Sequence, residues 1–102
     1  MINIKHVDIL KAVAQLEVEL VSGGIMFLFI EKRTIKWKVA SKKFDMDIFK
    51  EGADIAENAI AVRSMKEGKV LNEKVPREKY GRRLTTVAVP LVNDLNIPVG
   101  AF

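Results

Sequence analysis

Hydrophobic positions along the chain repeat with two different periods, and these periods predict its elements. In residues 3–21, apolar side chains recur every three or four positions, which is the repeat of a helix with one apolar face. The pair Gly23-Gly24 follows and predicts the end of this leading helix. We expect its main apolar stripe to face the core, and that stripe consists of Ile9, Leu10, Val13, Leu16 and Leu20.

Two further apolar residues of the leading helix lie off that stripe. Val7 and Val18 would remain on other faces if the main stripe packs against the core. A second apolar surface on a helix indicates a contact with another subunit. The pattern therefore predicts a homodimer that forms through the N-terminal helix.

The next two segments predict a β-hairpin. Residues 25–30 are continuously apolar, as in a central strand, and residues 31–34 form a polar turn. Residues 35–40 alternate, with Ile35, Trp37 and Val39 on one face and lysines on the other. The lysines place this second strand near an edge, where they discourage pairing with other chains.

A second helix and three strands are predicted for the rest of the chain. The helix covers residues 54–66, and Gly68 closes it. Polar residues 93–96 separate the last two strands, which makes a second hairpin. Pro90 lacks an N–H group for the sheet, so its end of the strand should be an edge or a bulge. The three strands are residues 70–75, 84–92 and 97–102.

These elements predict an α+β fold in which a five-stranded antiparallel sheet has one helix packed against it and another leading into it. A chain of 102 residues is one domain, with a leading helix in residues 1–22 and the sheet and packing helix in residues 25–102. The sequence stops within a predicted strand. We therefore expect an excised module that continues into an output helix and a downstream signalling domain.

Composition narrows the class of protein. The chain is 49% hydrophobic and 29% charged, as in a globular domain. It has no cysteine, which excludes a disulfide scaffold, a thiolate nucleophile and a cysteine-ligated zinc, and which fits a reducing cytoplasm. No stretch is long enough to cross a bilayer, and the N-terminus lacks the pattern of a signal peptide. We expect a cytoplasmic location without membrane insertion by this segment.

A net charge of +4 raises the question of nucleic acid. The basic residues are spread along the chain, however, and acidic residues are interleaved with them. A solvated, mildly basic surface is therefore the preferred interpretation, with no nucleic-acid partner. A small basic nucleic-acid-binding domain stays as an alternative.

Residue types that carry catalysis are scarce. The only histidine, His6, lies near the start of the leading helix, where a surface or subunit contact is favoured over haem or metal ligation. Asp45 and Asp47 could hold a metal, although a solvated turn is the simpler interpretation. Gly23-Gly24 lacks the following Lys-Ser/Thr of a phosphate-binding loop. We expect no catalytic residue, no metal and no cofactor, and therefore no enzyme.

Binding chemistry concentrates in residues 74–83, which hold five basic side chains and a tyrosine. Guanidinium groups bind carboxylates through paired hydrogen bonds. Because side chains alternate along a strand, only one of Arg82 and Arg83 can point inward. We predict a pocket for a small molecule, with a carboxylate as a candidate, formed by Tyr80 and Arg82 with help from Trp37. The alternatives are a solvated basic loop and, for Trp37, core packing.

About 40 residues from the second predicted helix onward carry a family resemblance, in the segments V-P-R-E-K-Y-G, V-A-V-P-L, N-D and P-V-G-A. This pattern resembles the PAS-like sensor domains, related to Cache domains, of bacterial methyl-accepting chemotaxis proteins and related regulators. The matching residues are Glu67, Gly68, Val75, Pro76, Tyr80, Gly81, Val87, Ala88, Val89, Pro90, Leu91, Asn93, Asp94, Val99, Gly100 and Ala101.

The resemblance implies a PAS-like five-stranded antiparallel sheet and a ligand-sensing function. It also implies that ligand binds between the sheet and the 54–66 helix, and that the last strand relays binding to an output helix. The chain departs from the pattern at residues 95–98, where Leu-Asn-Ile-Pro replaces the usual glycine-containing turn. A dimerisation module that binds no ligand is the competing interpretation.

Overall fold

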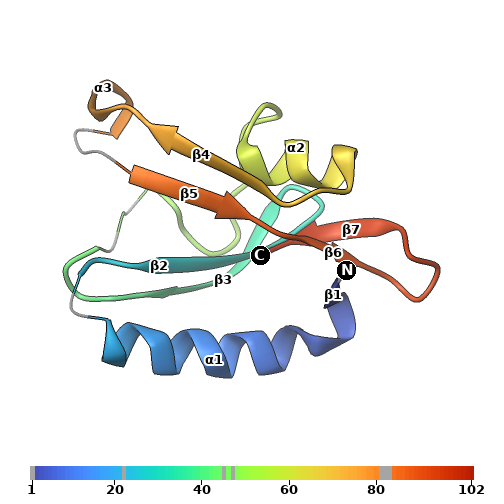
Figure 1. Cartoon of the computed structure of the whole chain (residues 1–102), viewed down its shortest axis with the longest axis horizontal. Helices are drawn as coiled ribbons and strands as arrows, with labels where there is room; N and C mark the ends of the chain where they lie inside the picture. The colour runs from blue at the N-terminus through green and yellow to red at the C-terminus, as the bar shows by residue number, and fades with distance from the viewer. Residues whose placement is uncertain (1, 22, 45, 47, 81–83) are drawn as a thin grey trace.

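The chain folds into three layers (Figure 1). A five-stranded sheet lies in the middle, with α1 on one side and with α2 and a β-hairpin on the other. This computed structural model describes residues 2–21, 23–44, 46, 48–80 and 84–102, and the backbone alone of Lys79 and Tyr80. The α+β class is confirmed. The elements are β1 (Ile2–Asn3), the 3-10 helix η1 (Ile4–His6), α1 (Val7–Leu20), β2 (Met26–Glu31), β3 (Thr34–Ala40), α2 (Ile60–Glu67), β4 (Leu71–Val75), α3 (Arg77–Tyr80), β5 (Leu84–Ala88), β6 (Pro90–Val92) and β7 (Pro98–Ala101).

The larger sheet has the strand order β1-β6-β7-β2-β3, and β4 pairs only with β5 in a separate two-stranded sheet. The prediction of one five-stranded antiparallel sheet is therefore wrong in two respects, because β1 runs parallel to β6 and because β4 and β5 leave the sheet. The cause is a break in the predicted 84–92 strand. Pro90, which has no N–H to donate, starts β6, and the chain passes there from one sheet to the other.

A bulge in β3 changes the face of the sheet to which part of its side chains point. Phe29 pairs with Trp37, but the next residue, Ile30, pairs with Ile35, so Lys36 is an extra residue. One extra residue moves the following side chains to the other face of a sheet. The prediction that Ile35 and Trp37 share a face is therefore wrong, since Ile35 packs on the α2 side and Trp37 on the α1 side.

The α1 helix contacts the sheet through a different face from the one its periodicity predicted. Ala14 is fully buried, and Val7 and Leu10 pack against the aromatic cluster on the sheet. Large aromatic side chains project from this side of the sheet, so a small residue such as Ala14 allows the helix to approach. The prediction that Val7 faces a partner is wrong, and four residues of the predicted core stripe are exposed: Ile9, Val13, Leu16 and Leu20.

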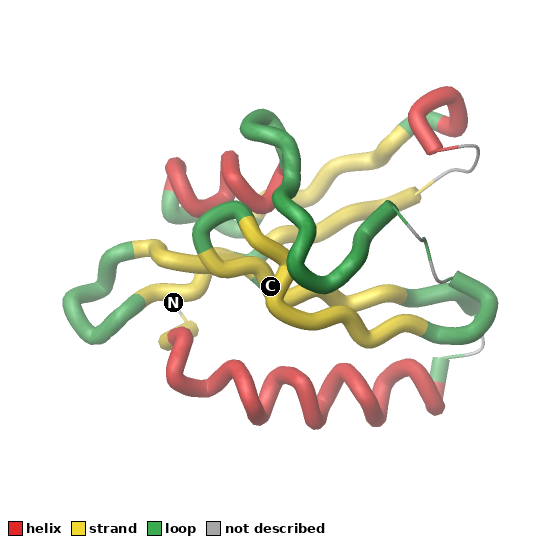
Figure 2. The backbone as a smooth tube through the Cα atoms, turned by 180° about the vertical axis from the view of Figure 1, so that it is seen from behind, coloured by secondary structure: helices red, strands yellow, loops and turns green. Residues whose placement is uncertain are grey.

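The α2 helix begins at Ile60, six residues later than predicted. The preceding segment instead runs beside the edge of β3, where the Ile35 N–H donates to the Ala53 carbonyl at 2.9 Å. Its backbone groups have partners on β3 and therefore do not need a helix. Figure 2 shows this segment as a loop that runs across the near side of the molecule to α2. Gly68 ends α2 in the left-handed conformation, with φ +64°, as predicted.

The second predicted hairpin is confirmed, and β6 pairs with β7 in antiparallel fashion. In its turn, the Asn93 side-chain oxygen accepts hydrogen bonds from the N–H groups of Leu95 and Ile97 at 2.9 and 3.0 Å. Asn96 has a φ of 63°, the conformation that a glycine would otherwise supply. The turn residues that differ from the family pattern therefore still close a tight hairpin.

Each face of the larger sheet carries its own apolar cluster. The α1 side is packed by buried Phe29, Trp37 and Leu91, with half-buried residues around them. The α2 side is packed by Ile30, Ile35, Ile55, Ala61, Val62 and Ala101. Gly100 lets β7 approach β2, because a Cβ at this position would lie 2.7 Å from the Ile30 carbonyl oxygen.

Candidate ligand-binding site

A cavity of about 910 Å³ lies on the α2 side of the larger sheet. The sheet forms its floor through β2, the loop before α2 forms one wall, and α2 with the β4–β5 hairpin forms the rest. Small-molecule sites are commonly about 300–1,000 Å³ and mostly apolar. The lining here is mainly apolar and includes Leu28, Ile30, Phe44, Phe49, Ala59 and Val75.

The hairpin turns one face toward this cavity. Along β4, Leu71, Glu73 and Val75 occupy alternate positions and are more buried than the residues between them. Thr86 pairs with Glu73 across the hairpin, and its hydroxyl donates to the Glu73 carbonyl at 3.2 Å. The face is therefore apolar at both ends of β4 and polar at Glu73 in the middle.

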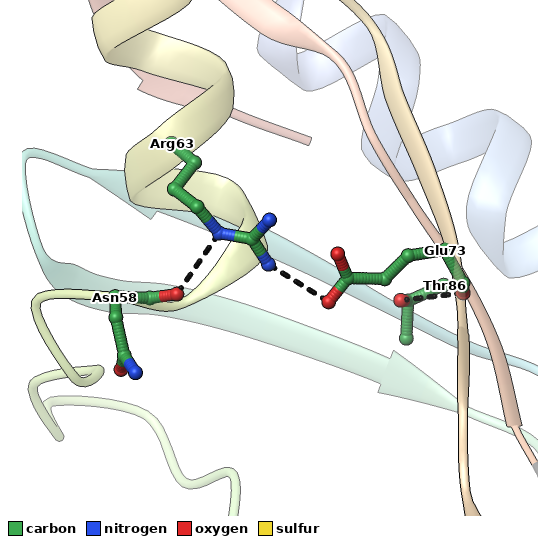
Figure 3. Close-up of polar contacts among 4 residues, drawn as sticks. All are labelled: Asn58, Arg63, Glu73 and Thr86. Atoms are coloured by element: carbon green, nitrogen blue, oxygen red, sulfur yellow. Dashed lines mark hydrogen bonds and ion pairs between the residues drawn. The ribbon is translucent and has the colours of Figure 1, made fainter.

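An ion pair between Arg63 on α2 and Glu73 on β4 forms the charged part of the lining (Figure 3). Arg63 Nη2 lies 2.8 Å from Glu73 Oε1, and Arg63 Nε donates to the Asn58 carbonyl at 3.1 Å. The hydrogen bond to Glu73 raises the pKa of the Arg63 guanidinium above its usual value. The guanidinium is thus held in place at the cavity wall and stays charged.

Ser64 provides a second polar link between α2 and the hairpin region. Its side chain is fully buried, and its hydroxyl lies 2.6 Å from the Lys69 carbonyl oxygen and 3.3 Å from that of Ala88. Lys69 precedes β4, and Ala88 ends β5. The hairpin is therefore connected to α2 by hydrogen bonds at two neighbouring helix positions.

Trp37 lies on the other face of the sheet from this cavity. Its ring is 5.8 Å from the Phe29 ring and 5.9 Å from the Phe102 ring, and Lys11 Nζ is 5.8 Å from its centre. Core packing, the alternative considered for Trp37, is what we observe, and the residue does not line the cavity. The role of Trp37 in ligand binding stays a prediction.

The other two predicted ligand residues fall outside what the structure describes. Arg82 is outside the described residues, as is the side chain of Tyr80. The backbone of residues 77–80 forms the short helix α3, where the sequence predicted a loop. A carboxylate site at Tyr80 and Arg82 therefore stays a prediction.

The candidate metal ligands do not come together in the described part of the chain. His6 is exposed at the end of η1, and Asp45 and Asp47 lie outside the described residues. Among the residues that are described, no group of three or more His, Cys, Asp or Glu side chains could hold a metal ion. In the same residues, no helix has the length and apolar character needed to span a membrane.

Several basic side chains form ion pairs with acidic neighbours. Besides the Arg63 pair, Arg33 lies 3.5 Å from Glu57, and Lys36 lies 4.0 Å from Glu31. Both of these pairs are exposed to solvent, so their energetic contribution is small. These three pairs offset part of the positive charge of the described residues, and two of them join residues that are distant in the sequence.

The sequence analysis missed Arg63 and Glu73 as site residues, although one signal could have found Glu73. It occupies the middle of the alternating set Leu71, Glu73 and Val75, so a carboxylate shares a strand face with two apolar residues. A charge on an apolar strand face requires a partner. That partner could have been sought on the adjacent helix, where Arg63 lies.

Comparison of the chain with family models, curated proteins and solved structures finds no match.

Proposed function

We propose that this chain is a ligand-sensing domain of a bacterial chemotaxis-type signal-transduction protein, located in the cytoplasm, and that its ligand occupies the cavity between β2, α2 and the β4–β5 hairpin. The observation that carries this proposal is a cavity of about 910 Å³ with a largely apolar lining and an ion pair in its wall. The resemblance of the C-terminal half to PAS-like sensor domains supports the same position between sheet and helix.

The lining favours a ligand with an apolar body and a carboxylate. A guanidinium has five N–H donors, and Asn58 and Glu73 accept from two of the three nitrogens of Arg63. A ligand carboxylate would compete with Glu73 for the same guanidinium. This proposal keeps the carboxylate class that the sequence suggested but assigns its recognition to Arg63.

Competition for Arg63 provides a route from the cavity to the last strand. Ile60 and Arg63 line the cavity, while Ala61 and Val62 of the same helix pack in one cluster with Ala101 of β7. A ligand that moves α2 therefore changes its packing against β7. Such a ligand shifts the equilibrium between two packings only by its difference in affinity for them.

Native mass spectrometry and a thermal-shift screen test the proposal on the purified 102-residue chain. The probes are aliphatic and aromatic carboxylates, each paired with the alcohol of the same carbon skeleton. We expect a carboxylate to bind and to raise the melting temperature more than its alcohol does. Leu28→Trp, which fills the cavity from β2, should remove the shift, whereas Val70→Trp, outside the cavity on an exposed position, should not.

Two outcomes would overturn the proposal. One is that no probe raises the melting temperature and no small molecule accompanies the protein in the mass spectrum. The other is that a probe binds but Leu28→Trp leaves its affinity unchanged, which would place the site elsewhere. The first outcome would favour a dimerisation module that binds no ligand.

A further inference from the structure

Two strand edges border the same cavity without a strand beside them. β2 pairs with β7 only at Ile30 and Glu31, so on that side its first half has no neighbouring strand among the described residues. In the same part of the chain, β5 pairs with β4 alone. Both stretches line the cavity. A strand with one free edge presents a row of N–H and C=O groups to which a further strand can add.

In β2, the residues whose backbone groups face the free edge are Met26 and Leu28. Alternate residues of an antiparallel strand direct their N–H and C=O groups to opposite edges. The Lys32 N–H donates to the Val99 carbonyl of β7 at 3.1 Å, which fixes the edge that Lys32 faces. Ile30, Leu28 and Met26 occupy alternate positions and face the same edge, and of these only Ile30 pairs with β7.

In β5, the corresponding residues are Thr85 and Val87. Val89 and Phe102 exchange two backbone hydrogen bonds of 2.8 Å, so the backbone of Val89 faces the line of β7. Val87 and Thr85 occupy alternate positions before Val89, and their backbone groups therefore face the same line. We call the space between residues 26–28 of β2 and residues 85–87 of β5 the strand slot.

We propose that one strand fills the strand slot, and that this strand continues β7 beyond Phe102 in a longer form of this polypeptide. At the entrance of the slot, Ala101 pairs with Ile30 on one side and with Pro90 on the other. A single strand therefore fits between β2 and β6 at this point. A continuation of β7 needs no loop to reach the slot, whereas a separate peptide loses the freedom of a second molecule. The added strand would join the two sheets into one.

The two edges require the same alternation from the added strand. In the register of β7 with β2, its first and third residues would exchange hydrogen bonds with Leu28 and Met26. In the register of β7 with β6, its second and fourth residues would do so with Val87 and Thr85. Alternate residues of one strand face opposite edges, so a single strand satisfies both sides. If either edge were shifted by one residue, both edges would need the same backbone groups.

The side chains around the slot specify part of the added strand. Its second residue would lie between Phe27 and Val87, on the α1 side of the sheet. Val87 is 52% exposed, and the Phe27 ring stacks on the Phe102 ring at 5.6 Å. We therefore expect an apolar second residue, which would cover part of Val87. The first and third residues would lie on the cavity side and complete its floor beside Leu28.

Amide hydrogen exchange measured by NMR tests this inference, which goes beyond the proposed function and requires no ligand. The test protein carries Thr-Val-Thr-Val-Thr after Phe102, and its matched control carries Thr-Pro-Thr-Pro-Thr, which lacks the N–H groups that would face β5. We expect the first extension to slow exchange at Leu28 and Val87 by about tenfold or more relative to the control. Phe27 and Thr86 face β3 and β4, so their amides should change less. Equal slowing at all four amides, or slowing at none, would overturn the proposal.

Cross-linking tests the register, because the chain has no cysteine of its own. Cysteine at the second added position should form a disulfide with Val87→Cys, and cysteine at the first should form one with Leu28→Cys, since each pair lies directly opposite. Cysteine at the third added position is the control for Val87→Cys, because its side chain points to the other face. Mass spectrometry after thiol alkylation detects each bond. A strand that cross-links to one side only would not join the two sheets and would overturn the proposal.

The free peptide Thr-Val-Thr-Val-Thr, blocked at both ends, identifies the source of the strand. Because it must bind the 102-residue chain from solution, we expect it to protect Leu28 and Val87 far less than the extension does. Strong protection by the peptide together with none by the extension would assign the slot to a partner protein and would overturn the continuation of β7. None of these measurements involves Arg63, so a negative result here leaves the proposed ligand site to its own test.

Discussion

The two faces of the larger sheet are built differently. On the α1 side, Phe29, Trp37 and Leu91 are each less than a tenth exposed, and the rings of Phe27 and Phe102 stack at 5.6 Å. On the α2 side, a cluster of smaller aliphatic residues fills one part of the interior and leaves a cavity of about 910 Å³ in the other. One face is filled by aromatic rings, and the other keeps a cavity.

The contacts that hold each outer layer differ in the same way. The α1 helix is attached mainly by apolar packing, with Lys11 over the Trp37 ring as its polar contribution. The hairpin layer is attached through hydrogen bonds of Arg63 and Ser64 in addition to apolar contacts. Because Arg63 and Glu73 also line the cavity, the polar contacts of the hairpin layer are ones that any occupant of the cavity would meet.

The largest expected effect comes from removing the centre of the filled face. Trp37→Ala deletes a ring that contacts two other aromatic rings, and it should lower the free energy of unfolding by about 3–5 kcal/mol. Leu28 is half-buried at the cavity floor, so part of its side chain already faces empty space. Leu28→Ala should therefore lower the free energy of unfolding clearly less than Trp37→Ala does. Urea unfolding followed by circular dichroism measures both, and equal losses would contradict the distinction between the faces.

A substitution at Gly100 tests how closely β7 and β2 must approach each other. Gly100→Ala places a Cβ about 2.7 Å from the Ile30 carbonyl oxygen, a backbone atom that cannot move away alone. We expect a loss of about 1–3 kcal/mol, as for other overpacked sites. Gly23→Ala is the control, since a Cβ there meets no atom within 4 Å. If both variants are equally stable, β7 and β2 are less rigid than this packing requires.

Sequence periodicity predicted most elements, but it did not predict which side chains point to which face of the sheet. The α+β class, the leading helix and both predicted hairpins followed from apolar repeats and turn residues. The bulge at Lys36 could not be predicted, because residues 35–40 alternate without interruption and the extra residue shows only in the pairing with β2. For α1, the stripe with the largest apolar residues was assigned to the core, whereas Ala14 is the position where the aromatic cluster allows contact.

The candidate site was harder to predict than the fold, because its parts are brought together by tertiary contacts. A cavity lies between the sheet and the second helix, where the resemblance implied a ligand, and binding there stays a prediction. The charged residues that line the cavity differ from the predicted ligand residues, because the prediction was based on the basic run 74–83 and on Trp37. The run 74–83 can be recognised in the sequence because its basic residues are close together. Arg63 and Glu73 are ten positions apart, and they meet only because β4 passes beside α2.

Ser64 tests whether buried hydrogen bonds hold the cavity side together. Ser64→Ala removes the hydroxyl that lies 2.6 Å from the Lys69 carbonyl oxygen, in a part-buried contact, and 3.3 Å from the buried Ala88 carbonyl oxygen. We expect a loss of about 1–2 kcal/mol in the free energy of unfolding, together with faster amide hydrogen exchange in β4 and β5 than in α1. Equal acceleration in α1 would mean that the two sides do not open separately.

The smallest stability effect should come from the ion pair, although its effect on binding should be large. The Arg63 and Glu73 side chains are 42% and 40% exposed, so solvent screens them, and Glu73→Gln should change the free energy of unfolding by less than about 1 kcal/mol. The same substitution removes the carboxylate that competes with a ligand for the Arg63 guanidinium. A carboxylate probe should therefore bind several-fold more tightly to Glu73→Gln than to wild type.

Arg63→Gln and the neutral probes make this last test specific. Arg63→Gln should abolish the preference for a carboxylate over the alcohol of the same skeleton, while both compounds still enter the apolar part of the cavity. Glu73→Gln should leave the affinity for the alcohol nearly unchanged, because an alcohol gains little from an unneutralised guanidinium. Isothermal titration of the three proteins with one such pair separates the charge from the cavity. If Glu73→Gln instead lowers the affinity for the carboxylate probe, Glu73 contributes to binding by orienting Arg63. The competition that we infer between ligand and Glu73 then does not occur.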